Sequence, residues 1–276
     1  MNRILCSTGA LIGRPNGRNY KLLSELKNKI KVDGFEFMMY DSWYGEKDEL
    51  ISFLKTLDLN IPVMHFEKSI GEIISKGDKT ETEKAFLNFE INASMAQSLG
   101  IKKAVLHLWG GIASDRNFEN NIKAYPKLNK IAGNYGITLL IENVICNNLD
   151  PLTRLKELSS IYPDIKFVFD TKMAQFHRQM PLIYKEENNF LFKENRVGHI
   201  HLNDYRGEYM DFTNLKVLPV GEGDVDFKSF FEYLKKIDYS GDFTMESTAF
   251  NKEGIVDTNM LNEEISLIKK KYLLEN

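Results

Sequence analysis

The stretch Val197–Leu202, which reads Val-Gly-His-Ile-His-Leu, has the pattern of a strand in a closed barrel. Successive side chains of a β-strand point to opposite faces, so Ile200 and Leu202 share one face and His199 and His201 share the other. The apolar face suits a covering layer of helices, which directs both histidines into the interior of a barrel. His201 then lies nearer the end of the strand, where the interior opens.

Seven further runs have the length and composition of strands, and longer stretches with helical spacing separate them. Eight runs in 276 residues give about 34 residues per unit, close to the ~30 or more of a β-strand followed by a helix. The predicted strands are Ile4–Thr8, Gly34–Met38, Pro62–Phe66, Lys103–Leu108, Thr138–Asn143, Lys166–Asp170, Val197–Leu202 and Asp242–Glu246.

The clearest helix follows the capping-box pattern Thr80–Glu83. Phe86, Phe89 and Ala93 recur on one helical face, and Gly100 provides a stop signal. Alternation of strands and helices along the chain indicates an α/β fold with a parallel sheet.

Such a sheet either stays open and doubly wound or closes into a barrel. Gly9, Gly13 and Gly17 do not fit the glycine fingerprint that follows the first strand of dinucleotide-binding sheets, and no phosphate-binding P-loop motif occurs. We therefore predict a (β/α)8 TIM barrel that forms a single domain over residues 1–276, with functional side chains at the carboxyl ends of its strands.

Charge and cysteine content limit the class of protein. The formal net charge of −3 gives no basic surface for a phosphate backbone, so it argues against a nucleic-acid partner. No apolar run approaches the ~20 residues of a membrane span. The two cysteines, Cys6 and Cys146, are typical of reduced thiols, and we expect a cytoplasmic protein.

Polar residues end the otherwise apolar strand runs, and the last four of them predict a metal site. Three carboxylates and an imidazole that converge at a barrel mouth repel one another unless a cation compensates them. Mixed oxygen and nitrogen ligands suit one divalent ion, Mn²⁺, Mg²⁺, Co²⁺, Fe²⁺ or Zn²⁺. The strand-end residues are Glu36, His65, His107, Glu142, Asp170, His201 and Glu246.

Several motifs across nearly the whole chain resemble the xylose isomerase-like TIM-barrel superfamily. That group contains sugar and sugar-phosphate isomerases and epimerases, and it also contains the endonuclease IV repair enzymes. The motifs are Asp33-Gly34-Phe35-Glu36, Ile141-Glu142-Asn143, Phe167-Val168-Phe169-Asp170-Thr171, Gly198-His199-Ile200-His201-Leu202-Asn203-Asp204, Pro219-Val220-Gly221-Glu222-Gly223 and Thr244-Met245-Glu246.

The resemblance implies roles for five residues. Glu142, Asp170, His201 and Glu246 match the ligands of a single metal ion, and the two glutamates also match the acid/base pair. Arg206 matches an arginine that such epimerases use on substrate hydroxyls.

Two departures from the family pattern bear on the substrate. Met173 and Asn148 stand where the similar ketohexose 3-epimerases carry a histidine and a second glutamate, which argues against that particular activity. His65 and His107 match zinc ligands of the repair enzymes. The other zinc ligands have no counterpart at Met173 or in residues 214–220, so the trinuclear zinc site is not expected.

A divalent ion bound by these ligands can polarise the carbonyl of a hydroxy-carbonyl substrate and stabilise the enediolate formed when the neighbouring C–H loses its proton. Two glutamates on opposite sides of the substrate give epimerisation, and one acting with a proton shuttle gives isomerisation. The Gly221–Gly223 turn lies where barrels often hold a phosphate. The residues expected to contact the carbohydrate are His65, His107, Trp109, Lys172 and Arg206.

Three functions follow as hypotheses. The first is a metal-dependent isomerase or epimerase of a small sugar, polyol or sugar phosphate, in a protein that can form homo-oligomers. The alternatives are an endonuclease IV-like zinc phosphodiesterase acting on abasic DNA, and a sugar-binding barrel without activity.

Overall fold

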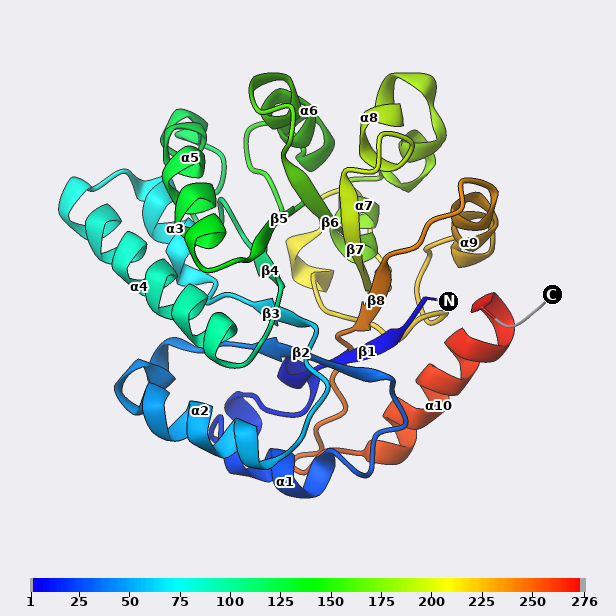
Figure 1. Ribbon diagram of the computed structural model, residues 1–276. Coiled ribbons are helices and arrows are strands. Elements are labelled where there is room, and N and C mark those ends of the chain that lie inside the picture. The colour runs from blue at the N-terminus through cyan, green and yellow to red at the C-terminus, as the bar shows by residue number, and fades with distance from the viewer. Residues whose placement is uncertain (1, 274–276) are drawn as a thin grey trace.

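The strands form a closed parallel barrel in the order of the sequence, β1 to β8 (Figure 1). The computed structural model describes residues 2–273. Every predicted strand is confirmed, with ends that differ by at most two residues from those expected. The strands are β1 (Ile4–Ser7), β2 (Gly34–Met38), β3 (Val63–His65), β4 (Lys103–Leu106), β5 (Thr138–Glu142), β6 (Lys166–Asp170), β7 (Val197–Leu202) and β8 (Asp242–Met245).

Helices surround the barrel, so the predicted TIM-barrel architecture is confirmed. The segments that follow β1, β2, β6 and β7 also contain short 3₁₀ turns. The helices are α1 (Leu23–Leu26), α2 (Lys47–Thr56), α3 (Ser69–Lys76), α4 (Lys79–Ser98), α5 (Phe118–Asn134), α6 (Pro151–Ile161), α7 (Thr171–Phe176), α8 (Asn189–Phe192), α9 (Phe227–Lys236) and α10 (Thr258–Ile268).

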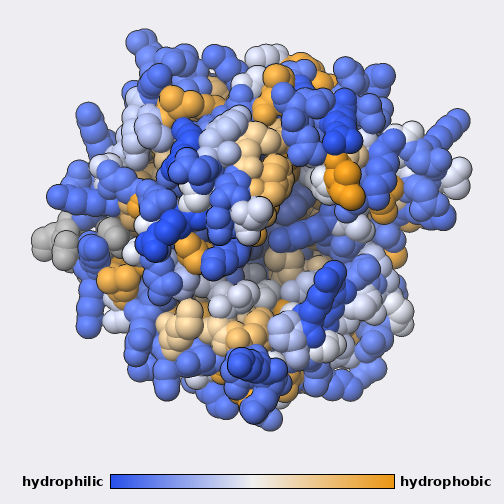
Figure 2. All heavy atoms as spheres, turned by 180° about the vertical axis from the view of Figure 1, so that it is seen from behind, coloured by the Kyte–Doolittle hydropathy of each residue, from blue (hydrophilic) through white to orange (hydrophobic). Residues whose placement is uncertain are grey.

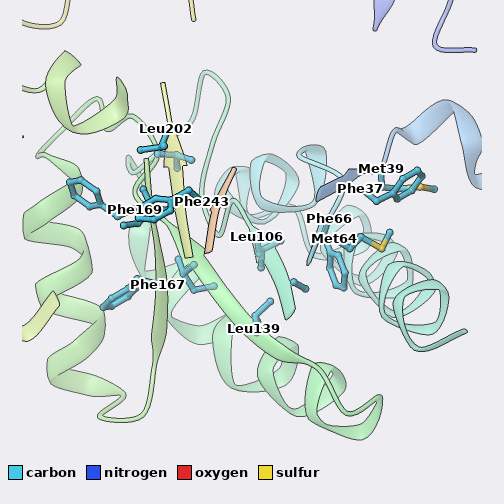
Figure 3. Close-up of a cluster of buried hydrophobic side chains, with 14 of the residues drawn as sticks. Phe37, Met39, Met64, Phe66, Leu106, Leu139, Phe167, Phe169, Leu202 and Phe243 are labelled. Carbon is cyan, nitrogen blue, oxygen red and sulfur yellow. The ribbon is translucent and has the colours of Figure 1, made fainter. Parts of the chain in front are cut away.

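Strand alternation divides the apolar core into two parts. The larger part lies between strands and helices, and it includes Ile200 and Leu202, on the face of β7 predicted to meet the helices. Figure 3 shows other side chains of this layer, among them Phe37, Phe167 and Phe243. The smaller part fills the barrel interior beneath the polar strand ends, which makes the barrel a packed core and not a pore. Its members are Leu5, Val63, Val105, Leu140 and Val168.

The helix expected from the capping-box pattern is confirmed as α4, but its cap differs. The Asp78 side chain accepts a hydrogen bond from the Glu81 backbone N–H at 2.8 Å, so the helix starts before the Thr80–Glu83 motif. Asp is as good an N-cap as Thr, and the residue that precedes the first helical turn takes the role. The helix ends ahead of Gly100, whose φ of +73° suits glycine.

The first and the last strand close the barrel. β1 pairs with β8, with Leu5 opposite Thr244. Next to this seam the Arg3 guanidinium donates to the Asp242 carboxylate at 2.6 and 2.9 Å. These contacts join residues about 240 positions apart in the sequence.

Hydrophilic side chains cover most of the face shown in Figure 2, with apolar ones in smaller groups between them. Along the part of the chain that is described, no helix has both the length and the apolar character needed to cross a bilayer.

Glu264 on α10 is a buried carboxyl group with a raised pKa. Its Oε1 accepts hydrogen bonds from the Val220 N–H and the Ser247 hydroxyl, both at 2.8 Å, while its Oε2 is buried without a partner. Burial raises the pKa of Glu264 to about 7. Because the folded state holds this proton more tightly than the unfolded state, the free energy of unfolding falls as the pH rises from about 4.5 through 7.

We therefore expect Glu264→Gln to stabilise the protein at pH 8 by about 2–3 kcal/mol and to change little at pH 4.5. Urea unfolding of the variant and the wild type at both pH values measures this difference. Glu263→Gln, an exposed neighbour on the same helix, serves as the matched control. An equal effect of Glu264→Gln at the two pH values would contradict the assignment of the buried proton.

Candidate metal centre and active site

The ends of neighbouring strands bring the four predicted metal ligands together. Ligand atoms of Glu142 on β5, Asp170 on β6 and His201 on β7 all lie within 4.8 Å of one another. Glu246 directly follows β8, and its Oε2 lies 3.7 Å from Nδ1 of His201. Parallel strands of a closed barrel direct their carboxyl ends to one rim, which explains how residues spread over 105 positions meet.

Asn203 orients two of these carboxylates. Its side-chain Nδ2 donates to Oδ2 of Asp170 at 2.7 Å and to Oε2 of Glu246 at 2.8 Å. The other oxygen of Asp170 accepts from the backbone N–H of Met173 at 2.8 Å and so caps α7. The two ligands are therefore fixed before any cation binds.

Glu36 on β2 orients His201 from below. Its Oε2 lies 3.2 Å from Nε2 of His201 and accepts from the Thr244 hydroxyl at 3.0 Å, and all three side chains are fully buried. His199 also directs its Nε2 to this oxygen, at 3.0 Å. A carboxylate that accepts the Nε2 proton leaves Nδ1 for a cation, as metal-binding histidines require. Nδ1 faces Glu142 Oε1 at 3.2 Å.

Two more histidines surround the other oxygen of Glu142. Nε2 of His65 lies 3.3 Å from Glu142 Oε2, and Nε2 of His107 lies 2.8 Å from the same atom. The His107 nitrogen is nonetheless poorly oriented for a hydrogen bond and stays unsatisfied. Burial lowers the pKa of His107 to about 4, so this imidazole is neutral at pH 7.

The electrostatics of the donor set fit a divalent cation. Burial raises the pKa of Asp170 to about 6, against the opposing charge of Lys172. Burial also lowers the pKa of His201, but the charges of Glu36, Glu246 and Glu142 outweigh it and raise that pKa well above the usual value. The protonated imidazole thus partly compensates the carboxylates in the position where a cation would do so. The oxygen and nitrogen donors that would hold the ion are those of Glu142, Asp170, His201 and Glu246.

Proton release should accompany metal binding, because the His201 imidazolium must lose its Nδ1 proton to become a ligand. We expect titration of the cation-free protein with Mn²⁺ at pH 7 to release about one proton per ion. Calorimetry in buffers of different ionisation enthalpy counts that proton, and the affinity should rise with pH. A binding enthalpy that does not depend on the buffer would contradict this arrangement.

A cavity of about 340 Å³ opens above the cluster. Glu142 and Glu246 line it together with Lys172, which is only 9% exposed. The remaining lining residues are Ser7, Gly9, Arg18, Met38, Met39, Tyr40, Asp41, Glu67, Lys68, Met173, Val217 and Thr248.

Four of the five predicted substrate contacts lie away from the lining of this cavity. His65 and His107 lie beside it, against Glu142. Trp109 is fully buried and packs edge-on against Phe118, because β4 ends at Leu106 and the chain turns outward after it. The Arg206 side chain is 66% exposed and lies 3.7 Å from Asp224. Lys172 is the one predicted contact that the structure places in the lining.

The glycine turn predicted near a phosphate site has another role. Oδ2 of Asp204 accepts hydrogen bonds from the backbone N–H groups of Gly221 and Gly223 at 3.0 and 2.8 Å. Its Oδ1 accepts from Tyr205 and Val225. The buried aspartate therefore uses the donors that a phosphate would need, and the expectation of a phosphate in this turn is wrong.

Sequence reasoning did not identify Lys68, Arg18 or Asn203 as site residues. Lys68 follows His65 by three positions, just beyond the end of β3, which is the signal that could have found it. Asn203 continues the inward end of β7. Arg18 reaches the cavity from the long segment after β1, where strand periodicity gives no information.

Residues 25–271 match the model of a protein family described as xylose isomerase-like TIM barrel. An L-ribulose 3-epimerase of Methylomonas sp. (strain DH-1) is 29% identical over 201 residues, which are 69% of this chain. The match spans 61% of the length of that relative.

Solved structures show the same fold. The crystal structure of D-allulose 3-epimerase from Methylomonas sp. in complex with D-allulose has a TM-score of 0.69 at 18% identity, over 98% of this chain and 97% of that one. The IOLI protein with a zinc atom has a TM-score of 0.72 at 15% identity, over 99% of both chains.

Proposed function

The chain belongs to the xylose isomerase-like TIM barrel family, and from this premise we propose that it is a divalent-metal-dependent epimerase or isomerase of a small carbohydrate. Similarity to an L-ribulose 3-epimerase supports a sugar as the substrate. The observation that carries the proposal is the convergence of Glu142, Asp170 and His201 at the base of a cavity that Glu246 also lines.

Glu142 and Glu246 are the proposed acid/base pair. They enter the cavity from β5 and β8, which β6 and β7 separate, so a substrate between them meets a carboxylate at each side. Burial raises the pKa of Glu246, but the charges of His201 and Lys68 outweigh it and lower that pKa below the usual value. The group is thus an ionised base at neutral pH.

When bound, the divalent ion would polarise the substrate carbonyl and stabilise the negative charge that develops as the neighbouring carbon loses its proton. The protein supplies the remaining functions. Glu246 takes the proton from one face, and Glu142 returns one at the other. Asn203 fixes the orientation of the Glu246 and Asp170 carboxylates by hydrogen bonds. Met173 and the apolar part of the cavity lining exclude water.

Solvent-deuterium exchange tests this proposal. The protein, loaded in turn with Mn²⁺, Co²⁺, Mg²⁺ and Zn²⁺, is incubated in D₂O with ketopentoses, ketohexoses and their phosphates. We expect metal-dependent incorporation of deuterium at a carbon next to the carbonyl, together with one tightly held ion per chain. Full loading without exchange into any of these substrates would contradict the proposal.

A zinc phosphodiesterase is the second candidate, and one observation favours it. His65, His107 and Glu142 form a further group whose ligand atoms lie within 4.8 Å of one another, and Nε2 of His107 is unsatisfied. A second ion there would share Glu142 with the first. Two zinc ions per chain together with nicking of an abasic duplex would favour this function, whereas one ion with sugar exchange favours the epimerase.

A further inference from the structure

Two lysines line the cavity. Lys68 precedes α3 and Lys172 lies in the first turn of α7, and both reach the cavity that contains the metal-ligand cluster. Within residues 2–273, neither ammonium group forms an ion pair or hydrogen bond. Lysine is seldom buried unless paired, yet Lys172 is only 9% exposed. An anionic group on a bound molecule would supply an acceptor to the buried Lys172, and the exposed Lys68 lines the same cavity.

The other acidic side chains of the lining already have partners. Both oxygens of Glu67 accept hydrogen bonds from Ser69, one from its N–H and one from its hydroxyl. Asp41 forms an ion pair with Arg18 at 2.8 Å. Within residues 2–273, neither carboxylate forms an ion pair with Lys68 or Lys172.

The carboxylates of the metal-ligand cluster would be occupied by a cation. A divalent ion would offset two of the three negative charges of Glu142, Asp170 and Glu246. The ammonium groups of Lys68 and Lys172, which line the same cavity, would then remain able to donate to a bound molecule. A cavity of this kind provides strong donors for an anionic group on a bound molecule.

This inference rests on the proposed function and narrows its substrate. We propose that the substrate carries an anionic group, and that Lys172 and Lys68 bind it. Two ammonium groups in one cavity suit the dianion of a phosphate ester better than a single carboxylate. Anchoring that group holds the carbon chain while its carbonyl end faces Glu142 and Glu246, so binding energy is used to orient the reacting carbon.

Paired substrates test the preference. The metal-loaded protein is assayed for deuterium exchange with a ketopentose and its 5-phosphate, a ketohexose and its 6-phosphate, and a ketose of the same length that ends in a carboxylate. We expect kcat/KM to be at least about 100-fold higher for the phosphate esters than for the neutral sugars. A comparable preference for the carboxylate would keep the anionic class and identify a sugar acid as its source.

Substitution of the lysines tests whether they cause the preference for the phosphate ester over the neutral sugar. Lys172→Met should lower the ratio of kcat/KM for the phosphate ester to that for the neutral sugar by about 10- to 100-fold, and Lys172→Arg should restore most of it. Lys130→Met, an exposed residue near the end of α5, is the control and should leave the ratio unchanged. Calorimetric titration with inorganic phosphate gives a readout without turnover, and Lys172→Met should weaken that binding.

The outcomes separate this inference from the proposed function. Exchange that is equal or faster with neutral sugars would overturn the anionic substrate and leave the epimerase intact. An unchanged ratio in both Lys172→Met and Lys68→Met would overturn the assignment to these residues. Exchange with none of the substrates would overturn the proposed function, and this inference with it.

Discussion

Replacing Glu246 by Gln is expected to slow exchange of the substrate proton with solvent by about 10²- to 10⁴-fold. Glutamine keeps the shape of the side chain and an oxygen that can accept the Asn203 hydrogen bond, now 2.8 Å long. It cannot take a proton. The loss should therefore appear in kcat, whereas the metal content after incubation with excess Mn²⁺ stays close to that of the wild type.

Glu222→Gln is the matched control for this experiment. Glu222 lies on the exposed Gly221–Gly223 turn near the same rim, so the variant removes one carboxylate without touching the cavity. It should keep wild-type kcat. If Glu246→Gln retained more than a tenth of wild-type kcat with its ion in place, Glu246 would not be the base.

Replacing Glu36 by Gln is expected to weaken divalent-metal binding by about 10- to 100-fold, although Glu36 is not a ligand. The ionised Glu36 accepts from His201 Nε2 at 3.2 Å, and this contact keeps Nδ1 directed toward Glu142. Burial raises the pKa of Glu36, but the charges and hydrogen bonds of His201 and His199 outweigh it and hold that pKa well below its usual range. A neutral amide oxygen accepts this hydrogen bond more weakly than a carboxylate does.

Competition for Mn²⁺ against a fluorescent chelator measures the affinity without relying on turnover. Asp242→Asn is the control, because Asp242 is a buried acid on a barrel strand at the end opposite the cluster. That variant should lose stability with its Arg3 pair and still bind Mn²⁺ like the wild type. Equal affinities of Glu36→Gln and wild type would show that His201 is oriented by other contacts.

The strands and the metal cluster were predictable because both follow from a period of two. An inward position at the end of a parallel strand is also a position at the rim, so His201 and Asp170 could be placed from their offset within the strand alone. The β7 pattern had the same consequence for His199, which lies one layer deeper.

The substrate contacts were less predictable because loops place them. Trp109 stands only two residues beyond His107, but the chain has already left β4 at Leu106 and carries the indole into the core. Arg206 follows β7 by four residues and its side chain is 66% exposed. Beyond a strand end, the direction of a side chain depends on the packing of the loop, which no local period encodes.

The pairing of β1 with β8 determines when the barrel can close during synthesis. Some 235 residues separate β1 from β8, so β1 cannot pair with its last neighbour until β8 has been synthesised. Loop-closure entropy opposes this pairing. Glu246 sits one residue past this strand. Glu246, the fourth candidate ligand, therefore becomes available only after β8 has been synthesised.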